Sequence, residues 1–141
     1  MLLIILVNCL VVALVVIIHY EALLLLSDMI PKLTISHRLR LVLGVLGALL
    51  AHTIEVWVFA IVYYYMNGVE KWGYLHGSFD NSLLDCVYYS FTTYTTLGFG
   101  DIEPIGAIRY LTGVEALTGL VLITWSASFL FIEMQRYWKI K

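Results

Sequence analysis

The sequence predicts an all-α membrane protein with three transmembrane helices, and three observations support this fold class. The chain has 141 residues, of which 62% are apolar and 13% are charged, and its mean hydropathy is +0.92. A domain of this size cannot bury so much apolar surface in a core of its own, so we expect lipid to be the solvent for most of it. The apolar stretches 2–26, 41–66 and 104–132 are each long enough to cross a bilayer core, which takes about 20 helical residues.

Charge and cysteine content exclude other classes of function. The formal net charge is −2 and the isoelectric point is about 6.0, so the chain presents no basic field for nucleic acid. Cys9 and Cys86 fit neither a disulfide framework nor a metal-ligand spacing, and we interpret them as small apolar side chains. The apolar composition nearly excludes a soluble enzyme, and we expect no enzymatic activity, no soluble substrate and no cofactor.

Residues 1–30 predict a retained transmembrane helix at the periphery of the fold. No basic region precedes the apolar run, the run is too long for a signal peptide, and no small-residue cleavage site follows Leu26. Because the stretch has no Arg or Lys at three-residue spacing, it is not a voltage sensor of the usual kind. His19 and Glu21 fall near its inner end, where we expect polar side chains to reach the membrane interface.

Basic residues orient the predicted helices, because Lys and Arg accumulate on the cytoplasmic side of short loops. Six of the eight lie in two places: Lys32, Arg38 and Arg40 in a loop at 31–40, and Arg136, Lys139 and Lys141 at the C-terminal end. Both places are predicted to be cytoplasmic, which puts the N-terminus and residues 67–103 outside. Residues 82–95 are too short to span the bilayer, so this segment must enter the membrane and return.

The returning segment ends in backbone that is not expected to be helical. Residues 82–95 predict a short helix that begins at Ser82, with Asp85 three residues on in a capping-box arrangement. Non-helical backbone at membrane depth is tolerated where its carbonyls line a water-filled path or bind ions. Gly98 and Gly100, with positive φ, would turn the carbonyls of 96–101 to one side, where a dehydrated cation meets stacked oxygens. The alternative is a Thr- and Gly-rich turn between helices.

This segment carries a family resemblance. Residues 88–104 read Tyr-Tyr-Ser-Phe-Thr-Thr-Tyr-Thr-Thr-Leu-Gly-Phe-Gly-Asp-Ile-Glu-Pro. They resemble the pore helix and selectivity filter of the potassium channel pore-domain superfamily, and Phe at the aromatic position is similar to the second filters of two-pore-domain potassium channels. More loosely, residues 41–138 resemble the pore domain, with an outer helix at 41–66, a pore helix at 82–95, a filter at 96–101 and an inner helix at 104–138. The chain looks like a small bacterial-type channel with an extra N-terminal helix.

The resemblance implies a homotetramer among membrane lipids, with four copies around an axis and K⁺ as the permeant ion. By that resemblance Thr96 gives its hydroxyl and carbonyl to the innermost K⁺ site, Leu97, Gly98 and Phe99 give carbonyls to the sites above, and Gly100 completes the filter. Asp101 stands behind the outer mouth, where the family's carboxylate bonds to the pore helix.

Residues that support the filter depart from the family pattern. Phe99 lacks the hydroxyl that ties the filter to the pore helix, and Tyr88 and Tyr89 stand where many members have tryptophans. Thr92 occupies the place where some members carry a carboxylate that pairs with the filter aspartate, so Asp101 needs another partner. We expect a filter that is less firmly held, with its ladder of oxygens unchanged.

The predicted inner helix offers a cavity face and a gate. Val121, Thr124, Ser128 and Ile132 fall within a narrow arc at about 3.6 residues per turn, and they match the region that faces the cavity in the family. Ordinary helix packing in the membrane is the alternative for these four. Gly119 matches the region of the family's hinge glycine, and close helix packing explains it equally well.

Three ionisable residues lie deep in the predicted spans, and Arg109 lies nearer the outer interface. Glu55 and Glu115 come at similar depth, roughly 16 Å from the outer ends at 1.5 Å per residue, His52 precedes Glu55 by one turn, and Arg109 is near enough to pair with either carboxylate. Three interpretations stay open for this group: a structural lock between outer and inner helices, a regulatory proton site, and a metal site formed by His52, Glu55 and Glu115.

The sequence thus predicts a potassium-selective channel that passes K⁺ passively, in a plasma membrane or a bacterial inner membrane. A weakly selective monovalent cation channel and a non-conducting membrane subunit with a pore-like fold are the alternatives. A transporter is disfavoured because no inverted pair of broken helices is visible.

Overall fold

The computed structural model describes residues 2–137, and three long helices dominate it. They are α1 (Leu2–Lys32), α2 (His37–Asn67) and α4 (Ile108–Tyr137), and each is long and apolar enough to cross a membrane. The shorter elements are η1 (Glu70–Trp72), β1 (Tyr74–Gly77), α3 (Leu83–Tyr94) and β2 (Ile102–Ile105). The predicted basic residues Lys139 and Lys141, and the predicted end of the inner helix at 138, lie outside the described residues.

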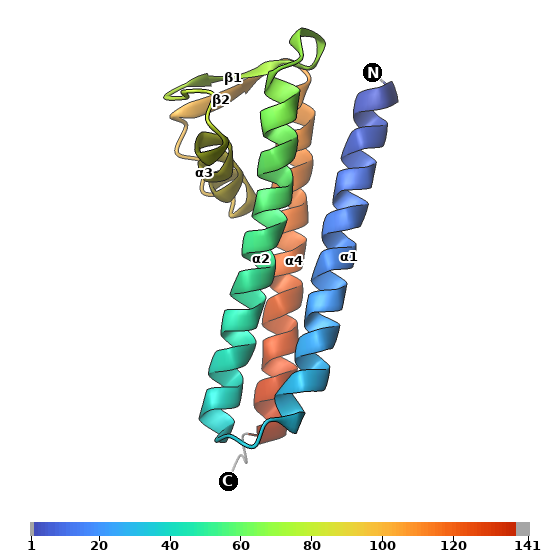
Figure 1. The fold of residues 1–141 in the computed structure, drawn as a ribbon, viewed down its shortest axis with the longest axis vertical. Coiled ribbons are helices and arrows are strands. Elements are labelled where there is room, and N and C mark those ends of the chain that lie inside the picture. Colours follow the sequence, from blue (N-terminus) through green and yellow to red (C-terminus); the bar gives the residue numbers. More distant parts are fainter. Residues whose placement is uncertain (1, 138–141) are drawn as a thin grey trace.

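The three long helices form one bundle with two distinct ends. The N-terminus and the connection between α2 and α4 lie at the same end, and the turn between α1 and α2 lies at the other end with the last turn of α4 (Figure 1). Arg38, Arg40 and Arg136 therefore share one end of the bundle. This is the end that the charge pattern predicts to be cytoplasmic.

The loop predicted at 31–40 is too long, since only residues 33–36 separate α1 from α2. The backbone N–H of Arg40 already donates to the carbonyl of Ser36 at 3.1 Å, and the Arg40 guanidinium donates to the carbonyl of Leu33 at 2.6 Å. Hydropathy marks where the chain enters lipid, whereas the helix itself begins four residues earlier in a polar turn. Arg38 and Arg40 thus belong to the first turn of α2, and Arg40 bonds to the residue that follows α1.

A two-stranded antiparallel sheet, absent from the sequence prediction, caps the end of the bundle that holds the N-terminus. β1 pairs with β2 in a register that places Tyr74 opposite Ile105 and Gly77 opposite Ile102. The inner helix consequently begins at Ile108 and not at 104, because residues 102–105 are held extended in the sheet. Gly73, with φ of 97°, lets the strands approach, since a Cβ there would lie 2.1 Å from the carbonyl oxygen of Ile105.

The core lies between α2, α3 and α4, at the level of α3. Fully buried side chains there include Phe59, Tyr63, Tyr94, Leu111 and Leu122. The outer surfaces of the long helices carry exposed apolar side chains such as Leu14, Leu50 and Leu117, as expected for surfaces in lipid. Buried aromatic side chains thus hold α3 against the long helices α2 and α4.

Candidate functional site

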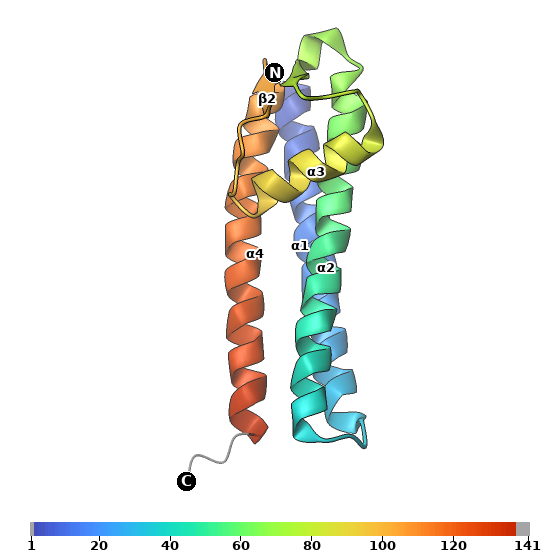
Figure 2. The same cartoon turned by 90° about the vertical axis from the view of Figure 1, so that its left-hand side faces the viewer.

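The short helix α3 directs the chain into the bundle. It starts near the sheet, slopes along α2 toward α4, and is followed by an extended segment that climbs back to β2 (Figure 2). Ser82 caps its start, because the hydroxyl oxygen accepts the backbone N–H of Asp85 at 3.0 Å. In a capping box the side chain at position 85 would accept the backbone N–H of Ser82. The Asp85 carboxylate instead accepts the backbone N–H of Asp80 at 2.9 Å.

The backbone after α3 alternates in handedness. Thr96, Gly98 and Gly100 have positive φ values of 58°, 51° and 78°, and neither Leu97 nor Phe99 between them does. An alternation at every second residue brings successive carbonyls to the same side of an extended strand. Glycine adopts this conformation without strain, whereas Thr96 is a non-glycine residue in the left-handed region, a feature that concentrates at functional sites.

Two backbone hydrogen bonds fix the start of this segment to α3. The N–H of Thr96 donates to the carbonyl of Thr93 at 2.9 Å, and the N–H of Gly98 donates to the carbonyl of Thr92 at 3.0 Å. The last carbonyls of the helix are thereby satisfied, as helix termini require. The position of the first residues of this segment is therefore set by the end of α3.

Tyr88 supports the other end of the segment and supplies the partner that Asp101 lacked in the sequence analysis. Its hydroxyl donates to the Asp101 carboxylate at 2.8 Å, and its ring stacks on Phe99 with a centroid distance of 6.4 Å and an interplanar angle of 4°. The hydrogen bond to Asp101 raises the pKa of Tyr88 above its ordinary value. A hydroxyl on the helix thus compensates for the one missing from Phe99.

Tyr89 and Thr92 lie behind the segment and bond elsewhere. The Tyr89 hydroxyl pairs with Thr112 Oγ1 at 2.9 Å, which ties α3 to α4, and the Thr92 hydroxyl donates to the Tyr89 carbonyl at 2.9 Å within its own helix. A cavity of about 420 Å³ lies among Thr92, Asp101, Thr112 and further residues of the segment. Tyr89 thus holds α3 against α4, Thr92 bonds within α3, and the hydrogen bond to Asp101 comes from Tyr88.

Parts of the segment are uncovered in the described part of the chain. A Cβ built at Gly98 or Gly100 meets no atom within 4 Å, and the side chains at Leu97 and Phe99 are 59% and 64% exposed. Within residues 2–137, the chain thus leaves much of this segment uncovered.

The predicted cavity face of α4 is also exposed in the single chain. This holds for Val121, Thr124, Ser128 and Ile132. The Thr124 hydroxyl donates to the carbonyl of Leu120 at 2.7 Å and the Ser128 hydroxyl to that of Thr124 at 3.0 Å, so their oxygens keep lone pairs free to accept. The opposite face, with Leu122 and Ser126, is buried.

Gly119 lies where the end of α3 touches α4. A Cβ at this position would lie 2.2 Å from the carbonyl oxygen of Tyr94 and 2.9 Å from its ring. Real Cβ atoms do not approach backbone oxygens this closely, so glycine is needed for packing at this point. Its role as a gate hinge remains a prediction, since α4 continues unbroken through the position.

The two deep glutamates have separate sets of partners. Glu115 accepts from the Tyr63 hydroxyl at 2.6 Å and from the Ser90 hydroxyl at 2.5 Å, which joins α2, α3 and α4. Glu55 contacts two histidines and the Tyr94 hydroxyl. Among the described residues, neither carboxylate forms an ion pair with the exposed Arg109. Glu55 and Glu115, which the sequence places at a similar depth, thus belong to two separate hydrogen-bond networks.

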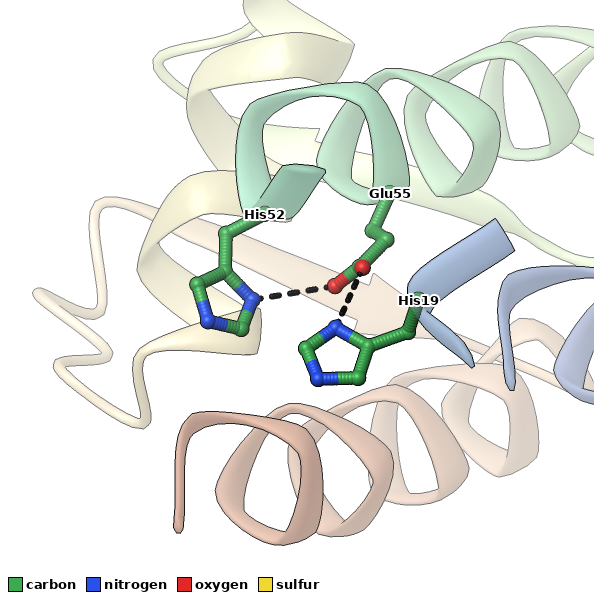
Figure 3. Close-up of side chains that lie close together, drawn as sticks. All are labelled: His19, His52 and Glu55. Atoms are coloured by element: carbon green, nitrogen blue, oxygen red, sulfur yellow. Dashed lines mark hydrogen bonds and ion pairs between the residues drawn. The ribbon is translucent and has the colours of Figure 1, made fainter. Parts of the chain in front are cut away.

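His19 is the functional candidate that the sequence analysis placed wrongly. It is fully buried, and its Nδ1 lies 2.8 Å from Glu55 Oε1 (Figure 3). Snorkelling is therefore wrong for His19, because the side chain points into the bundle. A histidine in an otherwise apolar run was the available signal, since ionisable groups in membrane spans normally face the protein interior.

Comparison with known proteins agrees with this arrangement. A family model described as an ion channel matches residues 51–136, which is more than half of the chain and contains α3, the extended segment and nearly all of α4. Neither the curated proteins nor the solved structures contain a match at the threshold applied. The chain therefore belongs to this ion channel family.

Proposed function

We propose that the chain is the subunit of a homotetrameric, potassium-selective channel in which residues 96–100 line the ion path. The observation that carries the proposal is the alternation of positive φ at Thr96, Gly98 and Gly100, on a segment whose one side is uncovered. Carbonyls aligned on that side replace the hydration shell of a K⁺ ion. The Thr96 hydroxyl and carbonyl serve the innermost site, and the carbonyls of Leu97, Gly98 and Phe99 serve the sites above.

The resemblance to potassium channels implies four copies, and what one chain supplies supports assembly with equivalent chains. A single segment offers one wall of an oxygen cage, and its exposed side needs equivalent walls to surround an ion. The carboxyl end of α3 lies beside Thr96 and carries a partial negative charge, which favours a cation on the axis. The exposed face of α4 with Thr124 and Ser128 lines a hydrated cavity below.

The charge pattern orients the channel in its membrane, with the N-terminus and the sheet outside and the turn at residues 33–36 inside. The chain then passes K⁺ down its gradient in a plasma membrane, of bacterial inner-membrane type. Substitution of Asn67→Cys should give a thiol that an impermeant reagent modifies from outside only. Labelling from the inside alone contradicts this orientation.

Flux through liposomes tests the conduction proposal. We expect the purified full chain to run as a tetramer, to pass K⁺ far better than Na⁺, and to be blocked by Ba²⁺. A reversal potential that does not distinguish K⁺ from Na⁺ identifies a weakly selective cation channel instead. Absence of flux from an intact tetramer identifies a non-conducting subunit, and a monomer or dimer in lipid refutes the fourfold pore.

A further inference from the structure

A cluster of three metal-ligating side chains lies outside the ion path, where α1 and α2 meet the end of α3. Figure 3 shows His19 from α1 and His52 from α2 directed at the carboxylate of Glu55 from both sides. The N···O distances are 2.8 Å from His19 Nδ1 to Oε1 and 3.0 Å from His52 Nδ1 to Oε2. Side chains of two consecutive helices thus converge on one carboxylate, although His19 and Glu55 are 36 positions apart.

The cluster is buried and carries a negative charge when Glu55 is ionised. The side chains of His19 and Glu55 are 0% exposed and that of His52 is 15% exposed. Within residues 2–137, no Lys or Arg forms an ion pair with Glu55. A buried carboxylate in a membrane span normally has a cationic partner, and the partners of Glu55 are the two imidazoles, which are cationic only when protonated. A metal ion held between these imidazoles and the carboxylate supplies the same positive charge.

The donor set and its spacing fit a transition metal. Two imidazole nitrogens and one carboxylate oxygen lie within 4.8 Å of one another. This is the three-ligand set of zinc sites that keep a fourth position open. Metal–ligand bonds of about 2.0–2.2 Å in a tetrahedron place the donor atoms roughly 3.3 Å apart. The N···O distances of 2.8 and 3.0 Å run to different oxygens of Glu55, and the three donor atoms lie within 4.8 Å of one another, so a bound ion requires the side chains to shift until both nitrogens and one oxygen lie at the tetrahedral spacing.

Neighbouring groups supply the outer contacts that such a site needs. His19 Nε2, on the far side of the ring, lies 3.4 Å from Ser126 Oγ of α4. A histidine that ligates through Nδ1 carries its proton on Nε2 and donates it to such a group, which fixes the ring. The Tyr94 hydroxyl contacts Glu55 and lies 2.9 Å from His52 Nδ1, so the site also adjoins the residue that ends α3.

We infer that His19, His52 and Glu55 form a binding site for a divalent transition metal ion of the Zn²⁺ class. Glu115 is not part of it, because that carboxylate is held by Tyr63 and Ser90. The bound ion replaces the two Nδ1 protons and joins α1 to α2 beside the last residue of α3. The ion enters past His52, the one partly exposed ligand.

Zinc binding to the intact full chain tests the site directly. The purified protein in lipid nanodiscs, stripped with chelator, is titrated with Zn²⁺ by calorimetry, and with Co²⁺ to read ligand geometry by visible absorption. We expect one Zn²⁺ per chain and a tetrahedral Co²⁺ spectrum. Because binding is read without conduction, this result is independent of whether the chain passes K⁺.

Variants separate this cluster from surface binding. His19→Gln and Glu55→Gln should each weaken Zn²⁺ binding at least about tenfold, and Ser126→Ala should weaken it less. His76→Gln, which removes an exposed histidine of β1, should leave the affinity unchanged. Should a buried variant fail to fold, His52→Gln at the rim replaces it. Lack of stoichiometric binding by the wild type, or unchanged affinity in folded variants of the cluster, overturns the proposal.

Discussion

Helix α3 and residues 95–101 form a unit with two sides. The two sides differ in how many hydrogen bonds and packing contacts they make with the rest of the chain. The side toward α2 and α4 is closed by the hydroxyls of Tyr63, Ser90 and Tyr89, by Glu115, and by the close approach of Gly119. The other side presents Gly98 and Gly100, where an added Cβ would meet no atom within 4 Å, and two exposed apolar residues, Leu97 and Phe99.

The difference teaches which properties belong to one chain and which need several. Contacts on the closed side determine whether a single subunit folds, because they are buried and mutually satisfied. The open side adds little to the stability of one chain, since it lacks contacts to lose. Substitutions on the open side should therefore affect conduction, and those on the closed side should affect folding and assembly first.

The largest effect is expected on the open side, at Gly98. Gly98→Ala should abolish selective K⁺ flux while the chain still folds, because alanine resists a φ of 51° and its Cβ meets no atom of its own chain. Flux in liposomes, with tetramer formation measured in parallel, checks this. Gly113→Ala is the matched control, since its Cβ also meets nothing but its φ is not positive, and it should conduct normally. Normal selectivity in Gly98→Ala contradicts the assigned filter.

Gly119 tests the closed side with the same kind of substitution. Gly119→Ala should destabilise the folded subunit by about 1–3 kcal/mol, because the new Cβ would lie 2.2 Å from the Tyr94 carbonyl oxygen and the helices must separate. Thermal unfolding in lipid, compared with Gly113→Ala, measures the loss. If stability is unchanged and only open probability shifts, Gly119 acts as a hinge and not as a packing residue.

Glu115 on the closed side distinguishes a structural lock from a regulatory group. Glu115→Gln should keep the tetramer, because an amide retains contacts with Tyr63 and Ser90. Glu115→Ala removes this acceptor from both hydroxyls, although Ser90 keeps its bond to the Val56 carbonyl at 2.9 Å and Tyr63 keeps its contact with Thr112, so we expect a total cost of about 1–3 kcal/mol. Thermal stability and tetramer yield should thus fall only for alanine. A changed open probability or pH response in an intact Glu115→Gln tetramer favours a regulatory proton site instead.

The sequence predicted the features that depend on residues close together along the chain. Apolar runs predicted three helices long enough to span a membrane, and Ser82 marked the start of α3. The motif predicted positive φ at Gly98 and Gly100, because glycine adopts this conformation readily, whereas the positive φ of Thr96 was not predicted. The resemblance to a channel family rested on the same motif.

Contacts between distant segments were not predictable in this way. The antiparallel pairing of 74–77 with 102–105 depends on how α3 brings the two ends together. The contacts of His19 with Glu55 and of Glu55 with Tyr94 depend on helix rotation, which a depth count of about 1.5 Å per residue does not give. The count therefore gave Glu55 and Glu115 the same depth, but it could not show that the two carboxylates have different hydrogen-bond partners.

The smallest effect is expected at the edge between the two sides, at Tyr88. Tyr88→Phe removes the hydrogen bond to Asp101 and keeps the ring that stacks on Phe99, so K⁺ selectivity should fall modestly and the tetramer should persist. The bond to Asp101 raises the pKa of Tyr88, so the support it gives is complete below about pH 10 and is lost as the pH rises through the raised value. Reversal potentials in mixed K⁺ and Na⁺ should therefore show an alkaline loss of selectivity in the wild type. Tyr88→Phe should lack this alkaline component, and its persistence in the variant assigns the titration to another group.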